Sequence, residues 1–265
     1  MRVHVVSDVH GNAEALARAG DGADALIVLG DLIEFADYQH PERGIIGRVL
    51  GAEVGARFAA IRSNGRPGEL MAFAREAWSH VPDPPAVVAD AVREQYAQLF
   101  GALETVGLPT YAIPGNVDLP ELWPEFVRDP VTAVDGRVVT IGGLRFGFVG
   151  GVPLPAGVEP RVGGPWRPNL LRLPEFEASV AALTGYDVLC SHAPPAVPDL
   201  AYDVVSRHAE SGSPALLRAV AEHRPRAALF GHVHQPLAAR VRVGPTECVN
   251  VGHFRRTGAP YVLRW

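Results

Sequence analysis

The sequence predicts an α/β fold, and three observations support this prediction. Short, continuously apolar runs rich in β-branched residues recur along the chain, as is typical of strands covered on both faces. Segments with helical periodicity lie between these runs, and such alternation is the usual pattern of α/β proteins. The tail from Pro236 to Trp265 alternates apolar and polar residues around turns at Gly244 and Gly258, which predicts three antiparallel strands that close the fold.

Five of the apolar runs are predicted to be buried strands, and each leads into a polar residue that can bind metal. In chain order they are RVHVVS (residues 2–7), DALIVLG (24–30), PTYAIPG (109–115), DVLCSH (187–192) and RAALFGH (226–232). The periodicity between them predicts helices over residues 12–20, 174–185 and 213–223. The first of these begins at an asparagine and ends at a glycine, which are common helix boundaries.

Two regions interrupt this alternation. Residues at about 41–107 are rich in alanine and helical in pattern, which predicts an insertion of two to four helices. Residues at about 151–173 are dense in proline and glycine, which predicts an ordered loop or a lid. We do not expect the insertion to be an independent unit, so the prediction is a single domain over residues 1–265.

Composition argues against several kinds of partner. The net charge is −5, and no block of Lys or Arg suggests a nucleic-acid-binding surface. No apolar run approaches about 18 residues, and the N-terminus has no signal-peptide pattern, so we expect a cytoplasmic protein that does not span a membrane. Cys190 and Cys248 lie far apart in apolar runs, and we predict that both are buried, reduced thiols.

Potential metal ligands follow all five predicted strands. Taken singly the signals are weak, because Asp-x-His and Gly-Asp are common in turns and His192 alone fits a hydrogen-bonded core histidine. Gly-His-Val-His at residues 231–234 is a stronger signal, because alternate side chains of an extended segment point the same way. Sites in open α/β sheets form outside the carboxyl ends of the strands. The sequence therefore predicts one metal site built from Asp8, His10, Asp31, Asn116, His192, His232 and His234.

In this order, the motifs SDVH, LGDLIE, PGNVD, CSH and GHVH resemble those of the calcineurin-like metallophosphoesterase superfamily. The family pattern is Asp-x-His, Gly-Asp, Gly-Asn-His-(Asp/Glu), a later His and Gly-His-x-His. The resemblance implies a four-layer αββα sandwich of two mixed sheets flanked by helices, with the site where the loop ends of the sheets meet. It covers most of the predicted strands, but neither the helical insertion nor the Pro/Gly-rich loop.

The resemblance also implies a chemistry. Two divalent ions are expected, and the nitrogen and oxygen donors suit Mn, Fe or Zn. By the family pattern Asp8, His10, Asp31 and His234 hold one ion, and Asp31, Asn116, His192 and His232 hold the other, so that Asp31 bridges. A metal-bridging hydroxide would then attack the phosphorus of a small phosphorylated substrate. Asp31, Asn116 and His192 are therefore the expected catalytic residues, and the ester could be a diester or a monoester.

One position departs from the family pattern. Val117 stands where the family has a histidine that lies near the leaving group, and valine cannot donate a proton. Asp118 remains, with no imidazole to orient. We expect intact metal chemistry and a weakened or relocated proton donor, and His253 in the segment NVGHF is the candidate replacement.

Other residues near these motifs are further candidates for the site. Tyr38 and His40 follow Asp31 in the chain and could line the pocket. Arg255 and Arg256 could pair with a second phosphate or lie exposed on the surface. Trp166 could stack on a base or pack within its loop.

Two other functional classes fit parts of the sequence. A metal-binding scaffold or interaction module of the same fold would explain Val117, but it would not need all seven ligands. A nuclease acting on double-strand breaks would need a basic surface, which the composition does not provide. The sequence is compatible with both a monomer and a homodimer.

Overall fold

Two mixed β-sheets form the centre of the protein in the computed structural model, which describes residues 1–63, 67–160 and 164–265. The central strands of each sheet are parallel and the edge strands β15, β13 and β5 are antiparallel to their neighbours. The first sheet has the order β15 (Tyr261–Arg264), β1 (Arg2–Val6), β2 (Ala25–Val28), β3 (Thr110–Ala112) and β4 (Val131–Ala133). The second has the order β13 (Arg240–Val243), β14 (Thr246–Asn250), β12 (Ala227–Phe230), β9 (Val188–Ser191), β6 (Leu144–Val149) and β5 (Val138–Ile141).

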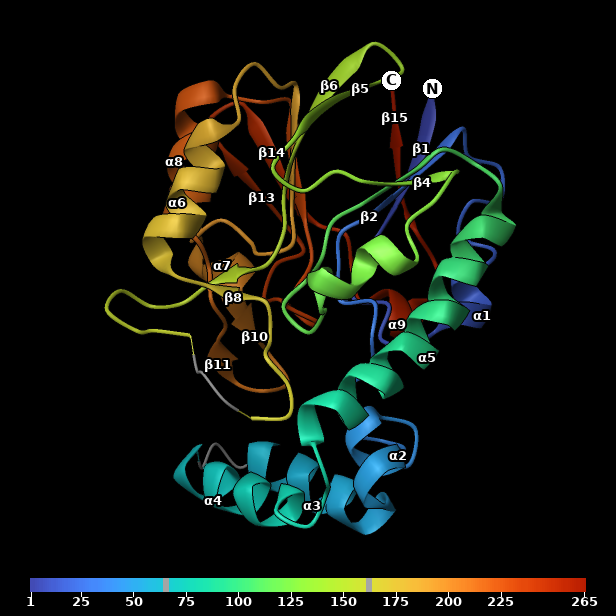
Figure 1. Cartoon of the computed structure of the whole chain (residues 1–265). Helices are drawn as coiled ribbons and strands as arrows, with labels where there is room; N and C mark the ends of the chain where they lie inside the picture. The colour runs from blue at the N-terminus through green and yellow to red at the C-terminus, as the bar shows by residue number, and fades with distance from the viewer. Residues whose placement is uncertain (64–66, 161–163) are drawn as a thin grey trace.

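Helices cover the outer face of each sheet. Figure 1 shows α1 (Ala13–Leu16) and α5 (Pro84–Val106) on one side of the sandwich, and α6 (Leu173–Ala182) and α8 (Pro214–His223) on the other. This is the four-layer αββα arrangement that the resemblance implies, and it is confirmed.

The sheets are buried on both faces, and the alternation of side chains along β2 shows how. Ile27 lies in the apolar core between the two sheets, whereas Leu26 and Val28 lie in the core between the first sheet and its helices. All three are fully buried. Successive strand residues point to opposite faces, so a strand covered on both sides is apolar at every position. The continuous apolar runs in the sequence have this origin.

The five predicted strands and the three predicted helices are all present, although α1 is limited to four residues. At the start of α8 the Ser213 side chain accepts a hydrogen bond from the backbone N–H of Leu216, which is a standard helix cap. Sequence reasoning missed β4 and the antiparallel pair β5–β6, although β6 is a central strand beside β9.

The C-terminal tail contains three strands, as predicted, but their pairing differs from the prediction. The tail holds β13, β14 and β15, but they do not form one antiparallel unit. β14 is antiparallel to β13 and parallel to β12, and β15 leaves for the other sheet, where it is antiparallel to β1. Polar–apolar alternation indicates a strand, but it carries no information about which sheet that strand joins.

The helical insertion comprises α2 (Ile45–Leu50), α3 (Ala52–Ser63), α4 (Pro67–Trp78) and α5. Figure 1 shows α2, α3 and α4 beyond one end of the sandwich, and α5 running from them along the first sheet. The α5 side chains Tyr96 and Phe100 are fully buried in the same core cluster as Leu26 and Val28. The insertion is thus anchored to the sandwich by its last helix.

The Pro/Gly-rich segment is ordered where the structure describes it, and residues 161–163 lie outside the described part. Its ends pair in parallel as β7 (Val152–Pro153) and β8 (Leu170–Leu171). The remaining short elements are the 3₁₀ helix at Pro120–Glu125, α7 (Pro198–Ala201), β10 (Tyr202–Asp203), β11 (His208–Ala209) and α9 (Phe254–Thr257).

Both cysteines are free and buried, as predicted. Within the described residues, none of the helices is long and apolar enough to cross a bilayer.

Candidate metal centre

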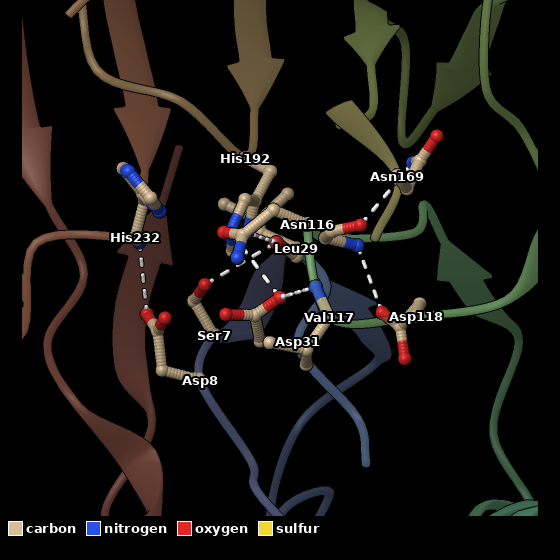
Figure 2. Close-up of polar contacts among 12 residues, drawn as sticks. Ser7, Asp8, Leu29, Asp31, Asn116, Val117, Asp118, Asn169, His192 and His232 are labelled. Carbon is tan, nitrogen blue, oxygen red and sulfur yellow. Dashed lines mark hydrogen bonds and ion pairs between the residues drawn. The ribbon is translucent and has the colours of Figure 1, made fainter. Parts of the chain in front are cut away.

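The seven predicted ligands converge at one edge of the sandwich. Asp8, Asp31 and Asn116 follow strands β1, β2 and β3 of the first sheet, while His192 and His232 follow β9 and β12 of the second. Figure 2 shows Asp31 between the Asp8–His232 pair and the turn that carries Val117 and Asp118. The parallel direction of these strands brings their carboxyl ends to the same edge, as open α/β sheets require for a site.

Several of these residues have an unusual backbone conformation. The φ angles of Asp8, His10, Asp31 and His232 are 58°, 42°, 52° and 68°, in the left-handed region that residues other than glycine rarely adopt. Such conformations cost on the order of 1–3 kcal/mol each and concentrate at functional sites. The strain lies where each strand ends and the chain must turn the polar side chain back over the sheet edge.

The first group of donors comprises Asp8, His10, Asp31 and His234, whose ligand atoms all lie within 4.8 Å of one another. Nε2 of His10 is 3.1 Å from Nε2 of His234 and 3.7 Å from Oδ2 of Asp31. Nε2 of His234 is 3.5 Å from Oδ1 of Asp8. Nitrogen and carboxylate donors at these separations surround a space in which one cation could contact all four.

The second group comprises Asp31, His192 and His232, whose ligand atoms also lie within 4.8 Å of one another. Nε2 of His192 is 3.5 Å from Oδ1 of Asp31 and 3.0 Å from Oδ1 of Asn116. Asp31 therefore has Oδ2 near the first group and Oδ1 near the second. This is the geometry that a bridging carboxylate needs.

Backbone carbonyls determine which imidazole nitrogen is available. Nδ1 of His192 donates to the carbonyl of Leu29 at 2.7 Å, and Nδ1 of His10 donates to that of Ile33 at 3.2 Å. In the neutral tautomer this leaves Nε2 with a lone pair, as in metal-binding histidines. The lone pair of His192 then faces the amide oxygen of Asn116, and two acceptors at 3.0 Å are compatible when a cation lies between them.

Burial explains the protonation of the site. It lowers the pKa of His232 to about 3 and lowers the pKa of His10 well below its usual value, so both rings are neutral and able to bind metal. Burial, with nearby Asp8 and Asp118, raises the pKa of Asp31 to about 6. Burial alone would also raise the pKa of Asp8, but nearby His234 lowers it.

Among the seven predicted ligands, two buried atoms lack a hydrogen-bond partner within the described residues: Oδ1 of Asp8 and Nε2 of His232. Unpaired buried polar atoms are costly and rare. Divalent cations, one in each donor group, would satisfy these atoms and neutralise the excess negative charge, so the residues present fit such ions.

Close packing at the site requires glycine at two positions. A side-chain carbon on Gly115 would overlap the Asp31 carboxylate, and one on Gly231 would overlap Ser7 and the Asp8 carboxylate. These contacts explain why glycine precedes Asn116 and His232.

The sequence suggested no partner for the carboxylate of Asp118. In the structure, three groups donate hydrogen bonds to it. Its carboxylate accepts hydrogen bonds from the backbone N–H of Leu32 at 3.1 Å, the N–H of Gly115 at 2.8 Å and the Tyr96 hydroxyl at 3.2 Å. The Tyr96 oxygen in turn accepts from the N–H of Leu119 at 2.8 Å. Asp118 thus joins the loop after Asp31 to the turn of Asn116, and Tyr96 attaches both to α5.

Val117 contacts the site through its backbone, while its side chain packs against the core of the first sheet. Its N–H donates to Oδ1 of Asp31 at 2.9 Å, and its carbonyl accepts from Nε1 of Trp166 at 3.3 Å. Trp166 stacks on Phe35 with ring centroids 3.9 Å apart. Of the two interpretations of Trp166, packing is therefore the one that the structure supports.

His253 lies beside the first donor group. Its ring stacks on His234, with centroids 4.0 Å apart, and meets His10 edge-on at 5.7 Å. Nε2 of His253 is buried and has no hydrogen-bond partner among the described residues. The ring is thus in contact with the predicted ligands, as a replacement donor would have to be.

Arg255 is not the exposed surface residue that one interpretation proposed. Its guanidinium pairs with the buried carboxylates of Glu34 and Asp37. Arg256 and Tyr38 are exposed, and His40, although exposed, lines the cavity beside His10, as one interpretation expected. Sequence reasoning missed the pairing because Glu34, Asp37 and Arg255 meet only through the fold.

A family model described as calcineurin-like phosphoesterase matches residues 1–236. The search of curated proteins finds no match. Among solved structures, the protein TT1561 of Thermus thermophilus superimposes with a TM-score of 0.57 at 17% identity, covering 99% of this chain and 98% of its own. A second structure, at 14% identity and the same coverage, gives a TM-score of 0.58. At these identities the likeness shows the fold alone.

Replacing Asp31 by Asn should stabilise the metal-free protein at neutral pH. The pKa of Asp31 is raised from 3.8 to about 6 in the folded state, so burying its charge costs free energy above pH 6 and nothing below pH 3.8. With metal removed by a chelator, the free energy of unfolding of D31N, measured with urea, should exceed that of wild type by about 3 kcal/mol at pH 7 and by much less at pH 4. The exposed variant Asp21→Asn is the control, and an equal difference at both pH values would contradict this account.

Tyr96→Phe should loosen the link between α5 and the metal loops. The change leaves the N–H of Leu119 without its partner, and the expected loss of unfolding free energy is about 1–3 kcal/mol. Tyr202→Phe, at a partly exposed tyrosine, should have no measurable effect. Retention of full stability in Y96F would mean that the hydroxyl is dispensable.

Proposed function

The chain belongs to the calcineurin-like phosphoesterase family, and from this premise we propose that it hydrolyses small phosphate esters with the help of two divalent metal ions. Mn, Fe and Zn all suit the donor set of imidazole, carboxylate and amide groups. The proposed substrates include both phosphodiesters and phosphomonoesters.

The observation that carries this proposal is the position of Asp31. Its two carboxylate oxygens face two separate groups of donors, which contain six of the seven predicted residues, and the seventh, Asn116, lies 3.0 Å from Nε2 of His192 in the second group. The first ion would be held by Asp8, His10, Asp31 and His234. The second would be held by Asp31, Asn116, His192 and His232.

Bound ions of this kind lower the pKa of water so that it can attack phosphorus near neutral pH, and they stabilise the negative charge that develops on the phosphate. The chain's own contribution is preorganisation. The carbonyls of Leu29 and Ile33 hold two imidazoles in the metal-binding tautomer, and the backbone of Val117 orients Asp31. These groups are in position before substrate arrives, so the reaction does not have to order them.

His253 is our candidate for the group that assists the leaving oxygen in place of a histidine at Val117. Burial lowers the pKa of His253 to about 4, so the ring is neutral at pH 7 and would act first as an N–H hydrogen-bond donor. Its contact with His234 supports this role.

A metal-binding scaffold without hydrolysis is not favoured. The strained backbone at Asp8, His10, Asp31 and His232 and the two unpaired buried atoms are features typical of a working site. For location we propose the cytoplasm, which suits two free thiols, Cys190 and Cys248.

Asp31→Asn should abolish hydrolysis while leaving the fold intact, because an amide cannot bridge two cations as a carboxylate does. With manganese added, the rate on bis-(p-nitrophenyl) phosphate should fall by about 10²-fold or more, and metal analysis should show less than two ions per chain. D21N serves again as the surface control. Wild-type protein that binds two ions yet turns over no faster than D31N would rule out an enzyme.

Val117→His should restore general acid assistance near the leaving group. The expected gain is at most about 10²-fold for alkyl esters, whose alkoxide leaving groups need protonation, and close to none for nitrophenyl esters. Val117→Phe is the control, because it enlarges the side chain without adding a proton donor. An equal gain on both ester types, or a gain in V117F, would show that the histidine acts in some other way.

A further inference from the structure

A cavity of about 400 Å³ adjoins the candidate metal centre on the side of His10. This volume is within the range of small-molecule sites. Apart from one glycine, every residue that lines it has a polar or charged side chain. It contains no apolar wall and no Phe, Tyr or Trp surface, in contrast to the mostly apolar lining that is usual for such sites.

The cavity lies between the metal-bearing core and the helical insertion. His10 and Arg255 line it from the core, whereas Arg48 on α2 and Gln98 on α5 line it from the insertion. A substrate whose phosphate lies at the metal centre would therefore extend its remaining part toward residues of the insertion.

Part of the lining is fixed by internal pairing. Arg255 is held by Glu34 and Asp37, and Arg48 pairs with Glu94. The Gln95 amide is occupied at both ends by the backbone of Glu34. These groups give the cavity its shape, but they have little capacity left for a ligand.

The Asn12 amide is also occupied, by the backbone of Ala15 and Arg255. This leaves Gln39, Gln98 and Arg43 as the groups best able to bind a ligand. The side-chain amides of Gln39 and Gln98 have no hydrogen-bond partner within the described part of the chain. Arg43 is 66% exposed, and its nearest carboxylate, that of Glu42, is 4.0 Å away. An amide both donates and accepts hydrogen bonds, which matches a hydroxyl group in either role.

We propose that this cavity binds the alcohol part of the substrate, and that this alcohol is a polyol or a sugar. The proposal rests on the proposed function in one respect, namely that the phosphate of the same molecule lies at the metal centre. Hydroxyl groups can use the free amides and Arg43, whereas an aryl or alkyl group would find little apolar surface. A nucleobase would find no Phe, Tyr or Trp ring in the lining, only imidazole and guanidinium groups.

The test compares glycerol 3-phosphate and glucose 6-phosphate with a nucleoside monophosphate and p-nitrophenyl phosphate, using manganese-loaded protein. Gln98→Leu removes one hydrogen-bonding group from an exposed position of α5. It should raise the KM for the two polyol esters roughly three- to tenfold, with kcat within about twofold and the KM for p-nitrophenyl phosphate unchanged. Arg43→Ala should act in the same direction.

Two matched controls test whether the effect is local. Thr105→Leu adds the same side chain two turns further along the same face of α5, outside the cavity. Arg75→Ala removes an exposed arginine from α4. Neither should change any KM. Equal effects of Q98L on the polyol and p-nitrophenyl esters, or a wild-type preference for the nucleotide, would overturn the cavity assignment.

Calorimetric binding of glucose 6-phosphate separates this proposal from the proposed function. If wild type binds the ester about three- to tenfold more tightly than Q98L but hydrolyses nothing, p-nitrophenyl phosphate included, the phosphoesterase proposal fails and the cavity assignment stands. If both proteins bind the ester equally, or neither binds it, the cavity assignment is wrong whatever the turnover.

Discussion

The buried carboxylate of Asp31 is the constraint on which the candidate site depends. Its two oxygens face different donor groups, and its orientation is fixed by the N–H of Val117. A buried charge with few neutralising partners is unfavourable, which is why burial raises the pKa of Asp31. His10 and His232 are neutral for the same reason, so they bring no positive charge to the site. The protein thus carries a local instability that divalent cations would remove.

The network around Asp118 gives this buried carboxylate partners from three parts of the chain. It accepts hydrogen bonds from two backbone N–H groups and from the Tyr96 hydroxyl. The partners of Asp118 come from both loops that carry ligands, so the residue positions Asp31 and Asn116 relative to each other. Tyr96 lies on α5, and the insertion therefore supports the metal loops directly.

The insertion has two roles: its apolar face packs in the core, and its polar residues line the cavity. Its buried face, through Tyr96 and Phe100, belongs to the core of the first sheet. Its exposed polar residues, among them Arg48 and Gln98, line the cavity beside His10. The same helix α5 therefore stabilises the ligand-bearing loops and borders the space next to them. A change in the exposed residues can alter what fits beside the candidate metal centre without disturbing the core.

The sequence by itself determined the α/β class, the five ligand-bearing strands and the identity of all seven converging residues. It could do so because strands buried on both faces leave a continuous apolar pattern, and because side chains that form a site in such a sheet follow the ends of its strands. Only the tertiary structure decided where β15 pairs, that β5 and β6 complete the second sheet, and where the insertion lies. Strand pairing and the contacts of Asp118 with Tyr96, of Arg255 with Glu34, and of His253 with His234 join residues distant in the chain. No local pattern encodes such contacts, because they follow from how whole sheets and helices pack.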